Sequence, residues 1–366
     1  MIDEKLLKTE EKVVYALRDL YKSYGYLPYK MSNFEEYELY SENKDFLVSD
    51  RVITFNDTTG KLLALKPDVT LSIIKNTKFE KGVKQKVYYN ENVYRVSPFS
   101  NNFKEIMQTG LECIGDIDIY DIYEAVYLSA KSLAVISDDF VLEISHLGLL
   151  SHLLDSVCDD SVFKDKAISF ISKKDTHDLE TLCKEYDVEQ SSVNKLLKFV
   201  TIYGDRNKVL KDLEDLGIAS DSFNSLIELS SLLDNTEFSD KIIFDFSVVN
   251  DMNYYNGIVF KGFVKGISQG ILSGGQYDKL LKKMHKKGSA IGFAVCLDLL
   301  SELKESLKTY DVDILLIYEE KCPKQRLSEF VNDLVCDGIT VTAQKSIPDK
   351  LRYKKLVKLD SEGVIC

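Results

Sequence analysis

The feature that most constrains the fold of this chain is a change of sequence texture between about residues 160 and 238. Within these limits leucines recur at helical intervals, as at Leu179, Leu182, Leu196 and Leu197, and no alternation typical of strands is seen. On both sides of this stretch, apolar and aromatic runs of strand length alternate with helical patterns. A purely helical segment inside a strand-rich region predicts one discontinuous domain that carries a helical insert.

The strand-rich parts predict an α+β core. Val52 to Phe55 and Leu62 to Leu65 bracket a polar loop that ends in glycine, which is typical of an antiparallel hairpin. Further strands are predicted at 86–96, 103–114, 139–145, 242–249, 256–264, 268–272 and 289–296, and helices at 5–25, 118–135 and 146–157. We expect the Gly-Gly pair at 274–275 to form a turn that leads into a helix from Tyr277.

The C-terminal part has its own pattern. From Val312 a strand, a helix at 325–335 and a second strand follow one another, which predicts a small α/β unit. We therefore expect two domains, a core at 1–308 that includes the insert and a small unit at 309–366. The second is at the low end of domain size.

The composition limits the classes of function. The chain has 366 residues, a formal net charge of −12 and 45% hydrophobic residues. An acidic chain repels nucleic acid, and no apolar run approaches the roughly 20 residues of a membrane helix. We therefore expect a cytoplasmic protein without a membrane segment. Seven cysteines without a C-x-x-C pair, and four histidines without ligand spacing, predict reduced thiols, no metal site and no cofactor.

Two basic clusters stand out in this acidic chain. One surrounds His285 at 282–287, and the other lies at 350–358. Runs of like charge are most often solvated. We therefore expect both clusters to form solvated helix faces or loops, and neither by itself indicates an RNA-binding protein.

Three short segments place polar side chains next to predicted strands. Asp68 and Thr70 follow the second strand of the hairpin, and Gln108 and Glu112 face the same way because side chains in a strand alternate with period two. A pair of tyrosines opens a later strand with phenols that donate or accept hydrogen bonds. Such a set suits a small cationic or zwitterionic ligand, for example an amino acid. The candidate pocket residues are Asp68, Thr70, Arg95, Gln108, Glu112, Tyr254 and Tyr255.

These segments, in their order, resemble the catalytic core of histidyl-tRNA synthetases, which are class II synthetases. The sequence NVYR at 92–95 with 103–115 resembles class II motif two. GGQYD at 274–278 resembles the approach to motif three, and AIGFA at 290–294 resembles motif three itself. The similarity covers about residues 5–300, including the insert. It implies a class II synthetase-like antiparallel sheet with flanking helices.

The resemblance also implies roles for the pocket residues. In that family the acidic residue matching Asp68 holds the ammonium group of histidine, together with the hydroxyl matching Thr70 and the amide matching Gln108. The imidazole ring of histidine is recognised by the residues matching Glu112 and Tyr255. The alternative is that Gln108 and Glu112 are sheet residues whose polar groups are satisfied by internal hydrogen bonds.

Arginine is missing where this family places its activating arginines. No arginine occurs from Asn207 to Gln325. The activating arginine is matched by Asn250 and the motif-three arginine by Leu299, whereas Arg95 of motif two is kept. A guanidinium grips phosphate with two parallel hydrogen bonds, and losing a transition-state arginine costs roughly 10³ to 10⁵ in rate. The resemblance therefore predicts a core that binds a ligand without forming an adenylate.

The regulatory subunits of ATP phosphoribosyltransferase combine these features, and the chain resembles them. The resemblance implies a non-catalytic partner of the short-form catalytic subunit in the first step of histidine biosynthesis. It also implies feedback inhibition by histidine, and a homodimer within a hetero-oligomer. The small C-terminal unit is short for an anticodon-binding domain, so tRNA is not expected as a partner.

Two other readings of the sequence stay open. The first is a divergent histidyl-tRNA synthetase, in which lysines such as Lys104 or Lys282 replace the missing arginines. The second is a binding module of another class, which senses an amino acid or acts on a kinase. The place of a histidine site is also open, because histidine has either the synthetase-like pocket or a subunit interface available to it.

Overall fold

The computed structural model describes residues 7–47, 51–96, 102–249, 254–303 and 310–365. It divides into two compact units, Met1–Glu302 and Leu303–Cys366. The boundary predicted between 308 and 309 lies in a segment outside the described residues. The first unit contains the α+β core and the helical insert, and it carries the candidate site.

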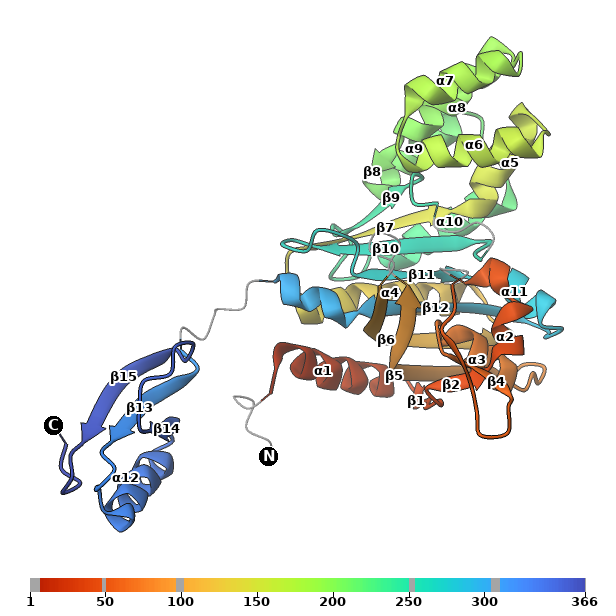
Figure 1. The fold of residues 1–366 in the computed structure, drawn as a ribbon. Helices are drawn as coiled ribbons and strands as arrows, with labels where there is room; N and C mark the ends of the chain where they lie inside the picture. Colours follow the sequence, from red (N-terminus) through yellow and green to blue (C-terminus); the bar gives the residue numbers. More distant parts are fainter. Residues whose placement is uncertain (1–6, 48–50, 97–101, 250–253, 304–309, 366) are drawn as a thin grey trace. The chain divides into compact units, whose positions relative to one another are not determined.

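The core is built on one large sheet (Figure 1). In the described residues it has nine strands in the order β1-β5-β6-β12-β11-β10-β7-β9-β8. Neighbours from β5 to β7 are antiparallel, whereas β1 pairs with β5 and β9 with β7 in parallel. The strands are β1 (Leu27–Pro28), β5 (Lys84–Val96), β6 (Phe103–Gly115), β7 (Phe140–His146), β8 (Tyr203–Gly204), β9 (Ile242–Asp245), β10 (Ile258–Val264), β11 (Leu272–Gln276) and β12 (Ser289–Cys296).

Two amphipathic helices cover one face of this sheet. The apolar stripe of α1 (Thr9–Ser23) is buried, and Tyr21 at its end contacts the ring of Phe293 in β12. The N-cap residue of the helix α4 (Ile119–Ile136) is Asp118, whose carboxylate accepts a hydrogen bond from the backbone amide of Tyr120. Helix α4 packs against β7, β10 and β12. The candidate site lies on the opposite face of the sheet.

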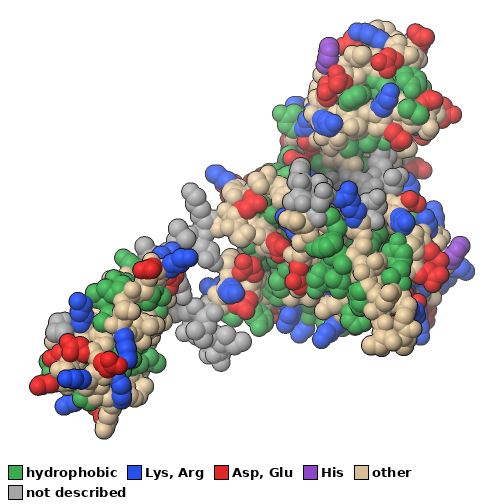
Figure 2. All heavy atoms as spheres, viewed as in Figure 1, with side chains coloured by type: hydrophobic (Ala, Val, Ile, Leu, Met, Phe, Trp, Pro, Cys, Tyr) green, Lys and Arg blue, Asp and Glu red, His purple; other side chains and the backbone are tan. Residues whose placement is uncertain are grey.

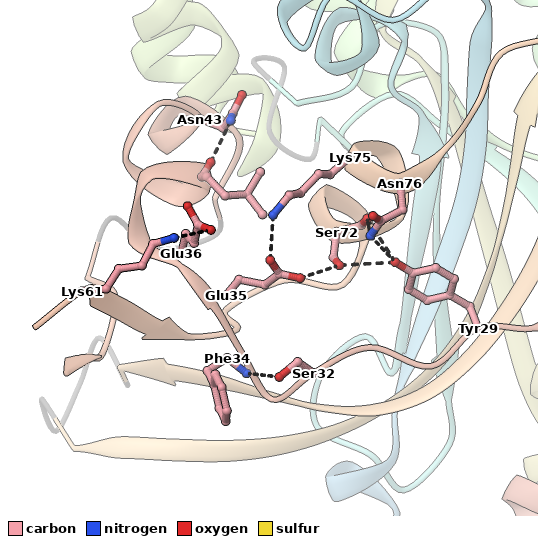
Figure 3. Close-up of polar contacts among 11 residues, drawn as sticks. Tyr29, Ser32, Phe34, Glu35, Glu36, Asn43, Lys61, Ser72, Lys75 and Asn76 are labelled. Atoms are coloured by element: carbon pink, nitrogen blue, oxygen red, sulfur yellow. Dashed lines mark hydrogen bonds and ion pairs between the residues drawn. The ribbon is translucent and has the colours of Figure 1, made fainter. Parts of the chain in front are cut away.

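A small antiparallel sheet, β2-β4-β3, lies in the same unit. Its strands are β2 (Phe34–Glu36), β3 (Thr54–Asn56) and β4 (Leu62–Leu65), so the predicted hairpin is confirmed. In Figure 3 Glu35 of β2 accepts from Lys75 (2.9 Å) and Ser72 (3.2 Å), both on the helix α3 (Thr70–Asn76). Tyr29 donates to the Ser72 carbonyl at 3.1 Å. These contacts fix α3, which begins at a candidate pocket residue.

The insert consists mainly of helices, as the leucine spacing predicts. Helix α5 (Leu147–Val157) leads into it, followed by α6 (Ser161–Ser172), α7 (Thr176–Glu185), α8 (Gln190–Thr201), α9 (Arg206–Asp215) and α10 (Asp221–Leu233). The expectation of no strand in the insert is wrong, because β8 pairs with β9 at the sheet edge. The buried Arg206 donates to the carbonyls of Ser239 and Ile242, and so ties α9 to the segment that returns to the core.

The prediction of a turn at Gly274 and Gly275 is wrong. Both residues lie inside β11, and the following helix α11 (Asp278–Lys283) begins one residue later than predicted. A Cβ atom at Gly274 would lie 2.4 Å from the carbonyl oxygen of Gly292 on β12. These glycines therefore serve a close approach of neighbouring strands rather than a reversal of the chain.

Other element boundaries also differ from the predictions. Strand β9 ends at Asp245 and β10 begins at Ile258, so the tyrosine pair precedes a strand rather than opening it. The segment after β12 is a 3₁₀ helix, Leu297–Glu302. Two short helical elements near the small sheet, α2 (Tyr37–Ser41) and the 3₁₀ helix Lys44–Phe46, have no counterpart in the predictions.

The second unit is a parallel three-stranded sheet with one helix, within the described residues. Strand β13 (Val312–Tyr318) lies between β14 (Val341–Gln344) and β15 (Tyr353–Leu359), and α12 (Lys324–Cys336) packs on the sheet. The predicted strand, helix and strand are confirmed. The expectation that the cluster at 350–358 is a helix face or loop is wrong for most of its length, because β15 pairs with β13 over this segment.

The surface of the first unit carries both signs of charge. Acidic and basic side chains are interspersed on the face visible in Figure 2. Long apolar helices are not found: no helix in the described part of the chain is long and apolar enough to cross a membrane.

Candidate functional site

A cavity of about 350 Å³ opens on the sheet face opposite α4. Its lining comes from β5, β6, β10, β11 and β12, together with the start of α3 and the segment before β10. The structure brings all the candidate pocket residues to this one cavity: Asp68, Thr70, Arg95, Gln108, Glu112, Tyr254 and Tyr255. Residues more than 180 positions apart in sequence therefore meet at one place in the fold.

Glu112 of β6 is the buried acid at the centre of this site. Its side chain is 2% exposed, and its carboxylate accepts from the hydroxyl of Thr70 at 2.8 Å and from the phenol of Tyr277 at 2.5 Å. Burial raises the pKa of Glu112 to about 8, although the two hydrogen bonds oppose that shift. The carboxyl is therefore mostly protonated at neutral pH until a cationic partner enters the cavity.

Space for this carboxyl is provided by a glycine on the neighbouring strand. Gly292 of β12 is paired in register with Glu112. A Cβ atom at position 292 would lie 1.7 Å from Glu112 Oε2. The same Cβ atom would lie 2.5 Å from the carbonyl oxygen of Leu111. The glycine in the motif-three segment is therefore required by the close approach of both the acid and the backbone of β6, not by its own backbone conformation.

Asp68 lies in the loop between β4 and α3, and its neighbours hold the loop in place. The backbone amide of Leu71 donates to Asp68 Oδ1 at 2.9 Å, and Arg95 Nε donates to the carbonyl of Pro67 at 2.9 Å. Removal from water raises the pKa of Asp68, against the opposing effects of the Leu71 amide and the Arg95 charge. A cationic ligand group would offset that cost.

A buried ion pair reinforces the same loop. Lys66 is fully buried and its Nζ lies 2.5 Å from the carboxylate of Glu91 on β5. The backbone amide of Tyr94 donates to the Lys66 carbonyl at 2.9 Å. The loop that presents Asp68 is thus attached to β5 at several points.

Tyrosines form the aromatic part of the lining. The ring centres of Tyr254 and Tyr255 are 4.6 Å apart, and those of Tyr254 and Tyr277 are 5.7 Å apart. Burial raises the pKa of Tyr254, Tyr277 and Tyr89 well above the ordinary value for a phenol. These phenols stay neutral hydrogen-bonding groups, and their rings give a cation or an imidazole an apolar surface.

Several lining residues were not among the sequence candidates. Tyr89 is paired with Gly110 on β6, and its place follows from the same period-two reasoning that selected Gln108 and Glu112. Lys261 is a single lysine in the otherwise apolar strand β10, and this was the signal that could have identified it. The missed residues with functional groups are Tyr89, Lys261, Ser273 and Tyr277.

The resemblance places arginines at positions 250 and 299, and the structure describes the second of these. Asn250 lies outside the described residues. Leu299 is half-buried in the 3₁₀ helix that follows β12, and it has an apolar side chain there. Among the described lining residues the cations are Arg95 and Lys261. The cavity can therefore hold a small ligand with a cationic part, and it offers two positive groups to an anionic part.

These features define a class of protein, a class II synthetase-like core with a polar cavity on an antiparallel sheet. A family model for histidyl-tRNA synthetase matches residues 2–300. The ATP phosphoribosyltransferase regulatory subunit of Caldanaerobacter subterraneus subsp. tengcongensis is 30% identical over 288 residues, which cover 77% of this chain and 75% of that protein. The chain belongs to the histidyl-tRNA synthetase family and, within it, to the ATP phosphoribosyltransferase regulatory subunits.

Solved structures show the same fold and confirm the predicted fold class. An ATP phosphoribosyltransferase regulatory subunit/histidyl-tRNA synthetase from Bacillus halodurans superposes with a TM-score of 0.76 at 23% identity, covering 96% of this chain and 94% of that one. A chain of the ATP phosphoribosyl transferase (HisG:HisZ) complex from Thermotoga maritima gives a TM-score of 0.63 at 18% identity, covering 79% and 97%.

Proposed function

We propose that this chain is the non-catalytic regulatory subunit of an ATP phosphoribosyltransferase. One observation carries the proposal. The acid-lined part of the cavity is complete, with Glu112 hydrogen-bonded on both oxygens, whereas the sequence from Asn207 to Gln325 has no arginine. Adenylate formation needs guanidinium groups on phosphate. A cavity that keeps the amino-acid side and has Arg95 as the guanidinium group among its described lining residues is suited to binding.

The partner is a short-form catalytic subunit of ATP phosphoribosyltransferase, and the reaction is the first step of histidine biosynthesis. The names of the relatives support this, since the Caldanaerobacter protein is a regulatory subunit of that enzyme. The Thermotoga structure supports it as well, because its HisZ chain is in complex with HisG. We further propose a homodimer of this chain within the hetero-oligomer, without tRNA as a partner.

Histidine is the ligand that we propose for the cavity, and it makes the assembly sensitive to feedback inhibition. Asp68 and Glu112 face the ammonium and imidazole groups, and Gln108, Thr70 and Tyr255 complete the contacts. Inhibition is then a coupling free energy of about 1 to 3 kcal/mol between the cavity and the catalytic site on the partner. Because coupling is reciprocal, binding of the catalytic subunit changes the affinity for histidine by the same factor.

Reconstitution tests this function. The purified chain is mixed with a short catalytic ATP phosphoribosyltransferase subunit, and formation of phosphoribosyl-ATP is followed by absorbance, with each protein alone as a control. We expect activity that rises on mixing, co-elution of the two chains, and loss of activity when histidine is added. Two chains that elute separately, with unchanged activity on mixing, would refute the proposal.

A divergent histidyl-tRNA synthetase is the second candidate. It is favoured by Arg95, the motif-two arginine, which lines the cavity next to Asp68. A lysine such as Lys261 would then have to bind phosphate in place of an arginine. The ammonium group is a point charge and lacks the bidentate geometry of a guanidinium. Activation of histidine by the chain alone separates this candidate from the first.

A further inference from the structure

Lys261 stands in a polar row that crosses the sheet on the cavity side. It is paired in register with Ser273 of β11 on one side and with Glu143 of β7 on the other. Paired residues on neighbouring strands point to the same face of a sheet. The neighbours of Lys261 within β10, Phe260 and Gly262, point to the opposite face, where Leu133 of α4 contacts Gly262.

The stem of this lysine has a fixed path. Gly270 lies beside it so closely that a Cβ atom at position 270 would be 2.4 Å from Lys261 Cε. The ammonium Nζ is 5.5 Å from the centre of the Phe263 ring. Lys261 lines both the main cavity and a second one of about 280 Å³, which Ser172 and Ser247 also line. The side chain therefore stands between the two cavities and borders both.

The charges around Lys261 leave its ammonium group available. Glu143 is its nearest acidic neighbour in the sheet, and burial together with the nearby Asp245 raises the pKa of Glu143. Asp245 itself is paired with Lys174 at 2.6 Å. The charges of Lys174 and Lys261 oppose that rise. Glu143 is thus the carboxyl paired with Lys261 across the sheet, and a ligand carboxylate would share the ammonium group with it.

The distance across the sheet fits a small zwitterion. Lys261 and Glu112 are on strands three positions apart, β10 and β6, and the row of Lys261 meets β6 at Gly110, two residues from Glu112. The separation is about 16 Å at the usual strand spacing and rise per residue. Extended lysine and glutamate side chains span most of this distance. The remaining gap matches the length of an amino acid with its cationic part at Glu112 and its carboxylate at Lys261.

We propose that Lys261 is the anion-binding residue of the cavity and that it holds the α-carboxylate of an amino-acid ligand whose cationic part lies against Asp68 and Glu112. The inference rests on the proposed function, because histidine is the ligand in question. It assigns to a lysine of β10 a positive charge at the cavity, from a stretch, 207–325, that contains no arginine. A single ammonium is sufficient for a carboxylate, whereas phosphate transfer calls for a guanidinium.

Calorimetric titration with two ligands tests the inference. Histidine carries the carboxylate, and histamine has the same imidazole and amine without it. In Lys261→Met the Kd for histidine should rise about 10- to 100-fold, while the Kd for histamine changes less than about twofold. Lys261→Arg should restore most of the affinity for histidine. Lys265→Met removes the same charge from an exposed position after β10 and should leave both constants unchanged.

The inference is overturned if Lys261→Met weakens both ligands equally, since that marks a structural role, or if it leaves histidine binding unchanged. Absence of histidine binding to the wild-type chain also overturns it. The proposed function is judged separately, by whether the wild-type chain activates the short catalytic subunit. Activation on mixing, together with an unchanged Kd in Lys261→Met, would remove the inference and keep the function.

Discussion

The two sides of the cavity differ in how firmly the fold holds them. On the acidic side, formed by Asp68, Thr70 and Glu112, the described carboxylates accept hydrogen bonds from neighbouring backbone or side-chain groups, and Glu112 is almost completely buried. On the basic side, Arg95 and Lys261 are half-buried. In this chain the fold thus holds in place the acidic groups, which suit the cationic part of an amino acid. The two basic groups, which could bind phosphate, are less buried. A synthetase core can in this way keep a binding site after its chemistry is lost.

The largest expected effect is a change in the free energy of unfolding with pH, which results from the burial of Glu112. Its pKa is raised from 4.5 to about 8, so its contribution to stability is fully present below about pH 4.5 and is lost as the pH rises through 8. The free energy of unfolding should fall by roughly 4 kcal/mol between pH 5 and 9 because of this group. Denaturant unfolding across that range measures it.

The matched variants make this prediction specific. In Glu112→Gln most of the pH dependence between 5 and 9 should disappear, because the amide does not ionise. Glu228→Gln, at an exposed position of α10, should keep the dependence of the wild type. If wild type and Glu112→Gln lose stability in parallel over this range, the carboxyl is not protonated in the folded protein and the acidic side is not held as described.

The next largest effect is expected at Gly292. An alanine there places a Cβ atom on the Glu112 carboxylate and should destabilise the fold by about 3 kcal/mol, as overpacking does. Chemical denaturation measures the loss. In the background of Glu112→Ala the same substitution should cost less, since the carboxylate is gone, although the close approach to the Leu111 carbonyl oxygen at 2.5 Å stays. Equal costs in both backgrounds would show that the glycine does not make room for the acid.

A smaller effect is expected when one hydrogen bond of the acidic side is removed. Thr70→Val keeps the shape of the side chain and deletes the donor 2.8 Å from Glu112. It should lower the free energy of unfolding by about 1 kcal/mol and raise the pKa of Glu112 further, because that hydrogen bond opposes the effect of burial. Thr181→Val, on the exposed part of α7, is the control. A pH profile identical to that of the wild type would argue against the contact.

The smallest effect is expected at the phenol of Tyr255. Tyr255→Phe removes one hydrogen-bonding group from the cavity lining and should weaken histidine binding by about twofold to tenfold, measured by calorimetry. Tyr15→Phe, at an exposed position of α1, should change nothing. Assembly with the catalytic subunit should be unaffected in both variants. An unchanged affinity in Tyr255→Phe would place the histidine site elsewhere, for example at a subunit interface.

Patterns of local spacing predict much of this fold. The period-two alternation of β6 places Gln108 and Glu112 on one face, and the leucine repeats of the insert identify its helices. The same reasoning does not predict that Gly274 and Gly275 lie inside a strand, because glycine is common both in turns and where backbones approach closely. The pairing of β15 was missed for a related reason, since its lysines resemble a solvated loop until a neighbouring strand is known.

The site was predictable where a motif places several polar groups together. Asp68 and Thr70 are two positions apart in sequence, and the resemblance connects them to β6. Lys261 reaches the cavity only through strand order, because β10 is three strands from β6 in the sheet. No spacing along the chain contains that information.

The central claim is that this cavity binds histidine without activating it. Histidine-dependent ATP–pyrophosphate exchange by the purified chain, in a sample shown by calorimetry to bind histidine, tests this most directly. We expect binding with no exchange above the level measured without protein, because Asn250 and Leu299 stand where the resemblance to histidyl-tRNA synthetases places the activating arginines. Robust exchange that depends on histidine would contradict the account and would identify the chain as an active synthetase core.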